Sequence, residues 1–133
     1  MATNFNAGPD FEFITAAQSL TAADSGKTFY MNTAGGFTLT LPAVADAVGV
    51  NYKFVVKTNC TTEYIIAEKA TADTNVILGN INHGATTGST TGATYINFIA
   101  TLDVVGDYVE LSCDGVKWYA SGSATTASAI TFT

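Results

Sequence analysis

Charged residues are scarce in this sequence. They make up 12% of its 133 residues, against about 25% in an average globular protein. The five basic residues are all lysines, arginine is absent, and the formal net charge is −6. Nucleic-acid binding needs clustered basic side chains, and an anionic membrane would repel a chain of this charge. We therefore expect neither nucleic acid nor a membrane as a partner.

Histidine and cysteine are also rare, and this limits the chemistry that the chain can support. His83 is the only histidine, and Cys60 and Cys113 lie far apart, without the paired spacing of a metal site. We predict that His83 is an exposed loop residue and that both cysteines are free, buried thiols. We predict no catalytic residue, no metal ligand and no cofactor, and we expect that the protein is not an enzyme.

Four acidic residues lie close together in the second half of the sequence: Asp103, Asp107, Glu110 and Asp114. Neighbouring carboxylates can bind calcium or transfer protons. However, Glu110 is expected on the outer face of a strand and Asp114 in a tight turn. We therefore predict solvated acids that do not converge on one site.

Long apolar runs are missing, both at the N-terminus and elsewhere, so we expect no secretory signal and no membrane-spanning helix. What the sequence has in abundance is threonine, with 22 copies, and a repeated alternation of apolar and polar residues. Threonine is β-branched and suits a half-exposed strand. The predicted fold is all-β: a single β-sandwich or jelly-roll-like domain of short antiparallel strands.

The alternation also locates the strands. It is strictest in residues 37–41, where Phe37, Leu39 and Leu41 share one face before Pro42 ends the strand. The other predicted strands span residues 11–20, 27–33, 50–58, 62–69, 75–78, 95–102 and 129–132. Residues 1–10 are predicted to form an irregular N-terminal arm, and residues 11–133 the sandwich domain. The Gly- and Thr-rich residues 79–92 are predicted to be a polar loop.

The last hairpin can be predicted in detail. The Asp114-Gly115 pair is the signal for a two-residue turn. A turn there would pair Cys113 with Val116 and Leu111 with Trp118, and it would place these side chains on one apolar face. A slip of one residue would expose the tryptophan, so the pattern predicts that Trp118 is buried.

Two segments resemble a known family. They are residues 29–42, FYMNTAGGFTLTLP, and residues 109–122, VELSCDGVKWYASG. A Gly-x-Thr-Leu-Thr-Leu-Pro strand followed later by an Asp-Gly-x-x-Trp hairpin is similar to a β-structured module of tailed-bacteriophage virion proteins. The module occurs in capsid decoration (cement) proteins and in parts of tail fibres, and the resemblance spans roughly residues 27–122.

The resemblance implies a structural virion protein. We expect a decoration protein that is synthesised in the host cytoplasm, binds the outer capsid surface and stabilises the shell. Its partners would be the major capsid protein and further copies of itself, in a homotrimer. The alternative is a receptor- or glycan-binding module of a tail fibre, which would use Tyr119 and residues 79–92.

Six apolar or aromatic residues are the candidates for the interface in such an assembly. Most lie near the chain ends, where chains fray unless they dock on a surface. The alternative for residues 129–132 is that they complete their own sheet. The candidates are Phe5, Phe11, Phe13, Tyr119, Ile130 and Phe132.

Overall fold

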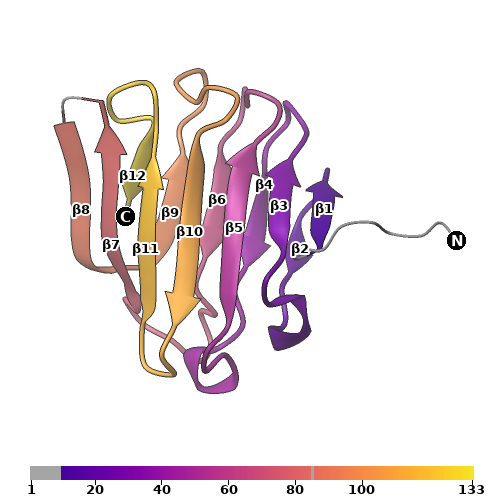
Figure 1. Cartoon of the computed structure of the whole chain (residues 1–133), viewed down its shortest axis with the longest axis vertical. Helices are drawn as coiled ribbons and strands as arrows, with labels where there is room; N and C mark the ends of the chain where they lie inside the picture. Colours follow the sequence, from indigo (N-terminus) through magenta and orange to yellow (C-terminus); the bar gives the residue numbers. More distant parts are fainter. Residues whose placement is uncertain (1–9, 85) are drawn as a thin grey trace, which may run out of the picture.

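The computed structural model describes residues 10–84 and 86–133, and it consists of two facing β-sheets (Figure 1). The strands of the first sheet are β1 (Phe11–Ile14), β3 (Thr28–Met31), β5 (Asn51–Val56), β7 (Ile77–His83), β8 (Thr86–Ala93), β10 (Tyr108–Cys113) and β11 (Trp118–Ser123). The strands of the second sheet are β2 (Gln18–Ser19), β4 (Phe37–Thr40), β6 (Tyr64–Ala67), β9 (Tyr95–Phe98) and β12 (Ile130–Phe132). Two short 3-10 turns are η1 (Ala22–Asp24) and η2 (Val44–Asp46). The predicted all-β sandwich is confirmed.

In the first half of the chain, successive strands alternate between the two sheets. The strand order is β1-β3-β5-β10-β11-β7-β8 in the first sheet, called sheet A here, and β12-β9-β6-β4-β2 in the second, called sheet B. From β1 to β6 the chain changes sheet at every strand, so each strand lies beside the strand two places before it and runs parallel to it. The β11–β7 pair is parallel as well.

The expectation that all strands are antiparallel, as in a jelly roll, is therefore wrong. Antiparallel pairing is confined to β5–β10, β10–β11, β7–β8, β6–β9 and β9–β12 among the described strands. The physical reason is that an alternating pattern specifies which face of a strand is buried. It is the same pattern whether the neighbouring strand runs parallel or antiparallel.

The core between the sheets is built from the inward residues that the alternation predicts. Phe29 of β3 stacks on Phe54 of β5, with ring centroids 5.5 Å apart. Trp118 of β11 is fully buried and stacks on Tyr52 of β5 at 5.7 Å. Burial of such large rings contributes strongly to stability, and it fixes the spacing of the two sheets. Cys60 is buried and free, and so is Cys113, as predicted.

The β10–β11 hairpin differs from its predicted register by two residues. Cys113 pairs with Trp118 and Leu111 with Ala120, so the connection has four residues instead of two. The Asp114 carboxylate accepts hydrogen bonds from the backbone N–H groups of Val116 and Lys117, both at 2.8 Å, and this closes the wider turn. A slip of two residues keeps the same side chains inward, so Trp118 is buried as predicted while Val116 is exposed.

Residues 79–92 form most of a hairpin, so the predicted loop is wrong. Strands β7 and β8 are the longest of the described strands and pair antiparallel. Gly79 is required here because a Cβ atom would collide with the Ala120 carbonyl oxygen of the neighbouring strand. The inward positions of β8 carry small residues such as Gly88, so the sequence of β8 lacks the alternating apolar side chains that would predict a strand.

His83 is buried at the end of β7, so the prediction of an exposed loop histidine is also wrong. Its Nε2 atom lies 2.9 Å from the carbonyl oxygen of Ile130 in β12. Gly88 leaves the space that the imidazole ring occupies, because a Cβ there would lie 3.0 Å from His83 Cε1. The histidine thus links the two sheets at one end of the sandwich.

The segments near the chain ends take two different forms. The predicted strand over residues 11–20 is divided into β1 and β2, which lie in different sheets. At the other end, β12 pairs with β9 of its own chain, and Ile130 is fully buried. This arrangement favours the alternative in which residues 129–132 complete their own sheet.

Candidate functional site

The first exposed surface is an aromatic cluster on β1, the edge strand of sheet A. Phe11 and Phe13 are 50% and 53% exposed, and their rings pack edge to face with centroids 5.5 Å apart. Both rings also contact Tyr30 of β3, at 6.1 and 5.7 Å. The Lys57 Nζ atom lies 5.5 Å from the centre of the Phe13 ring. We call these four residues the aromatic edge.

The charged groups beside the aromatic edge are paired with one another. Lys27 lies 2.9 Å from Asp24 and 3.4 Å from Glu12 of β1. The hydrogen bond from Lys27 to Asp24 raises the pKa of the lysine. One lysine offsets part of the charge of two carboxylates, so an ion-pair group of net charge −1 adjoins the strand that carries Phe11 and Phe13.

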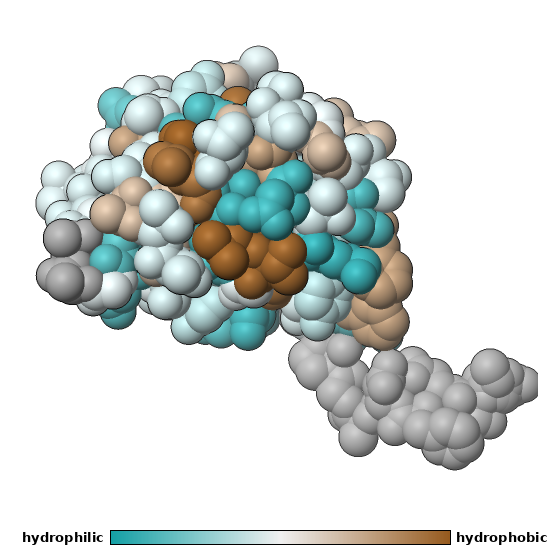
Figure 2. Space-filling model, turned by 90° about the horizontal axis from the view of Figure 1, so that it is seen from above, coloured by the Kyte–Doolittle hydropathy of each residue, from teal (hydrophilic) through white to brown (hydrophobic). Residues whose placement is uncertain are grey.

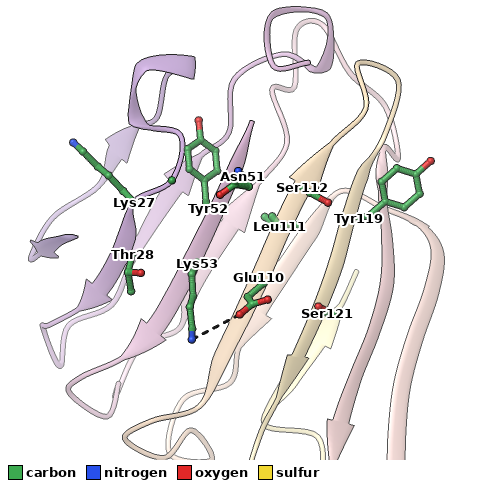
Figure 3. A pocket seen from close by; sticks show the side chains of 11 residues that line it. Lys27, Thr28, Asn51, Tyr52, Lys53, Glu110, Leu111, Ser112, Tyr119 and Ser121 are labelled. Atoms are coloured by element: carbon green, nitrogen blue, oxygen red, sulfur yellow. Dashed lines mark ion pairs between the residues drawn. The ribbon is translucent and has the colours of Figure 1, made fainter. Parts of the chain in front are cut away.

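The second surface is a shallow hollow of about 390 Å³ on the outer face of sheet A (Figure 3). Lys53 and Glu110 form an ion pair across it, with Nζ and Oε1 3.7 Å apart. Tyr119 is 46% exposed, and its hydroxyl donates a hydrogen bond to Asp114 at 2.8 Å, which raises the pKa of the tyrosine. Ser112 and other hydroxyl side chains supply further polar groups, so the hollow suits a polar ligand better than an apolar one.

The third surface is a groove of about 440 Å³ that is lined by residues of β8 and β12. These two strands lie at the side of the sandwich opposite to β1 (Figure 1). Gly88 lines it from the β8 side, Ile130 and Phe132 from β12, and Ala127 and Ser128 from the preceding loop. Phe132 is only partly buried. We call this hollow the β8–β12 groove.

Buried carboxylates form a fourth group, and they hold loops in place. Asp103 accepts the backbone N–H of Cys60, Asp107 that of Thr125, and Glu68 that of Val76. Burial raises the pKa of Asp103, and the nearby charge of Asp107 acts in the same direction.

The four acidic residues do not converge on one site, but Asp103 and Asp107 are buried, so the prediction that all four are solvated is wrong for these two. Asp103 and Asp107 precede β10, Glu110 lies on its outer face, and Asp114 follows its far end. Within residues 10–84 and 86–133, no three His, Cys, Asp or Glu side chains are placed to hold a metal ion. The buried acids instead accept hydrogen bonds from backbone N–H groups.

The predicted interface residues are now divided between surface and core. Phe11, Phe13 and Tyr119 are exposed, whereas Ile130 is buried within its own chain and offers no contact surface. Phe132 lies at the rim of the β8–β12 groove. Phe5 lies outside the described residues.

Three features of these surfaces were missed from the sequence. Tyr30 could have been found, because it alternates with the inward-facing Phe29 and Met31. The contact of Lys57 with Phe13 and the β8–β12 groove could not be predicted, because each brings together residues that are distant in the sequence.

Further apolar residues are exposed at one end of the sandwich. Figure 2 looks onto one end of the sandwich and shows apolar side chains enclosed by polar ones. Leu102 and Val105, both in the loop before β10, are among the exposed hydrophobic residues. None of the described helical segments is long and apolar enough to cross a lipid bilayer.

Comparison with known proteins gives no relative: no family model, no curated protein and no solved structure matches this chain.

Proposed function

We propose that the protein is a decoration protein that binds the outer surface of a bacteriophage capsid as a trimer and stabilises the shell. Its function would be mechanical. Each bound copy buries part of its surface against neighbouring capsid subunits, and many repeats of this contact resist the pressure of the packaged genome.

The observation that carries the proposal is the aromatic edge. Two half-exposed phenylalanines and a tyrosine in contact are unusual on the surface of a lone monomer. Aromatic residues are enriched at protein interfaces, where they bury a large area for little loss of side-chain freedom. The edge is therefore the surface that best fits a protein partner.

Two further properties support the proposal. The net charge of −6 suits the outside of a shell better than its DNA-facing interior. The segments that resemble virion proteins form β3, β4 and the β10–β11 hairpin, and many of their inward side chains belong to the core. The resemblance thus concerns the scaffold, and the aromatic edge is the candidate contact that this scaffold presents.

The test is binding of the purified protein to shells of the phage that encodes it, prepared without this protein. We expect hundreds of copies per shell and a higher melting temperature of the shell. A Phe11→Ser, Phe13→Ser double variant should lower the bound copy number at least tenfold while its circular dichroism spectrum stays native. Val48→Ser, at an exposed site in another part of the fold, is the matched control.

The results test the decoration role and the contact surface separately. Binding of the double variant at the wild-type level would show that the aromatic edge is not the contact. If the wild-type protein is absent from shells, or present in only a few copies per virion, the decoration role is wrong.

A second candidate is a glycan-binding module of a tail fibre, and the hollow on sheet A favours it. An exposed tyrosine beside hydroxyl groups and a Lys53–Glu110 pair can stack on and hydrogen-bond to a sugar (Figure 3). This role predicts few copies per virion and binding to host-surface glycans that is lost in Tyr119→Ala.

A further inference from the structure

The free edge of β8 is the only long, unguarded sheet edge among the described strands. The other three edge strands are β1 with four residues, β12 with three and β2 with two. β8 has eight residues, and none of them is charged or proline. Proteins usually protect such an edge with charges, proline or a covering segment, because its unpaired backbone groups accept another strand.

The β8–β12 groove lies directly beside this edge. Gly88 pairs with the fully buried Ile81, so it faces the interior, where the His83 imidazole occupies the space that a side chain at position 88 would need. A strand added next to β8 would place every second side chain over the groove, against Phe132 and the loop residues Ala127 and Ser128. The site therefore offers backbone partners for an extended segment and a partly apolar hollow for one large side chain.

We propose that residues 2–8 of a second copy of this chain add to β8 as an extra strand and insert Phe5 into the β8–β12 groove. The segment reads ATNFNAG and carries no charge. In an extended conformation Thr3, Phe5 and Ala7 share one face, and Asn4 and Asn6 share the other. That alternation matches a strand with one face on a core and one in water.

The geometry requires a second copy. Sheet A has seven strands, so six inter-strand spacings of about 4.8 Å place β8 about 29 Å from β1. Phe5 is six residues from Phe11, and six extended residues reach at most about 22 Å. Phe5 therefore cannot reach the groove of its own chain across the sheet.

The inference rests on the proposed trimer and specifies how its subunits join. The donated segment leaves the β1 end of one copy and pairs at the β8 end of the next, so donor and acceptor surfaces differ. Such a head-to-tail contact closes into a ring when the rotation between copies is one third of a turn. Three exchanges would then cover all three β8 edges.

Disulfide trapping tests the contact. We would mix two full-length variants, Thr3→Cys and Ser128→Cys, and oxidise them; Thr3 lies on the same face of the proposed strand as Phe5, so the phenyl anchor is kept. The native Cys60 and Cys113 are buried and should not react. We expect a covalent dimer in this mixture and none when Ser112→Cys, on the exposed outer face of sheet A, replaces Ser128→Cys.

Mass measurement by light scattering gives the second readout. The wild type should have a mass of 3 × 13.8 = 41.4 kDa and Phe5→Ala a mass of 13.8 kDa. Asn4→Ala, which changes the neighbouring residue on the other face, should remain at 41.4 kDa.

The other possible results would contradict either strand exchange alone or strand exchange together with the trimer. If Phe5→Ala remains a trimer and the disulfide does not form, strand exchange is wrong and the trimer stands. If the wild type is monomeric both in solution and on shells that it stabilises, strand exchange and the trimer are wrong and the decoration role stands.

Discussion

At the scale of single residues, Trp118 is the largest side chain in the core. It is fully buried and stacks on Tyr52 across sheet A. Trp118→Ala would leave a cavity that the surrounding strands cannot fill, so the free energy of unfolding should fall by about 3–5 kcal/mol. Urea denaturation measures this change.

Val116→Ala is the control for Trp118→Ala. Val116 belongs to the same hairpin but is 65% exposed, so its truncation should change stability by less than about 0.5 kcal/mol. A native-like denaturation midpoint for Trp118→Ala would contradict the inward face of β11.

Asp103 gives the protein a pH dependence of definite sign. Burial raises its pKa in the folded protein above the ordinary value of 3.8. Between these two pKa values the folded state holds a proton that the unfolded state has lost. The stability that Asp103 contributes is therefore full below about pH 3.8 and is lost as the pH rises through the folded-state pKa. Relative to Asp103→Asn, the wild type should become less stable from pH 3 to pH 7.

Asp114 should show the opposite trend and serves as the control. Hydrogen bonds from Lys117, Val116 and Tyr119 lower the pKa of its carboxyl group. Its contribution is present above the ordinary pKa and lost as the pH falls through the lowered value. Urea titrations of Asp103→Asn and Asp114→Asn over the same pH range should therefore diverge. Parallel curves would contradict the environment assigned to Asp103.

At the scale of elements, β12 is short but integral to the sandwich. Ala129 and Ile130 are fully buried, and the Thr133 carbonyl accepts the backbone N–H groups of Thr94 and Tyr95. Deleting residues 123–133 should therefore unfold the whole domain, as the loss of cooperative melting by circular dichroism would show. A truncated chain that melts cooperatively near the wild-type temperature would contradict this role.

The β7–β8 hairpin shows why one element could not be predicted. Its inward positions include Gly79, His83 and Gly88. None of these has a large apolar side chain, so the sequence shows no alternation of apolar and polar residues there. Two of them are explained only by a neighbour distant in the sequence: Ala120 for Gly79, and Ile130 for His83. Local composition indicated a loop because the stabilising partners lie elsewhere in the chain.

At the scale of the whole molecule, the fold depends on packing between two sheets. The described residues bring no three metal ligands together, and the buried acids bind backbone N–H groups. The melting temperature should therefore be the same with and without EDTA at about 1 mM. A clear decrease with the chelator would identify a cation site and contradict this expectation.

The sequence by itself determined the fold class, most of the strands and which face of each is buried. Phe29, Leu39 and Trp118 are all inward, because a period of two places alternate side chains on one face whatever the neighbouring strand is. Even the two-residue slip of the last hairpin preserves that face. Tertiary structure alone decided the parallel pairing within β1 to β6, the burial of His83 and the open edge of β8. These depend on which strands become neighbours, and that choice is made by packing between segments distant in the chain, which no local pattern encodes.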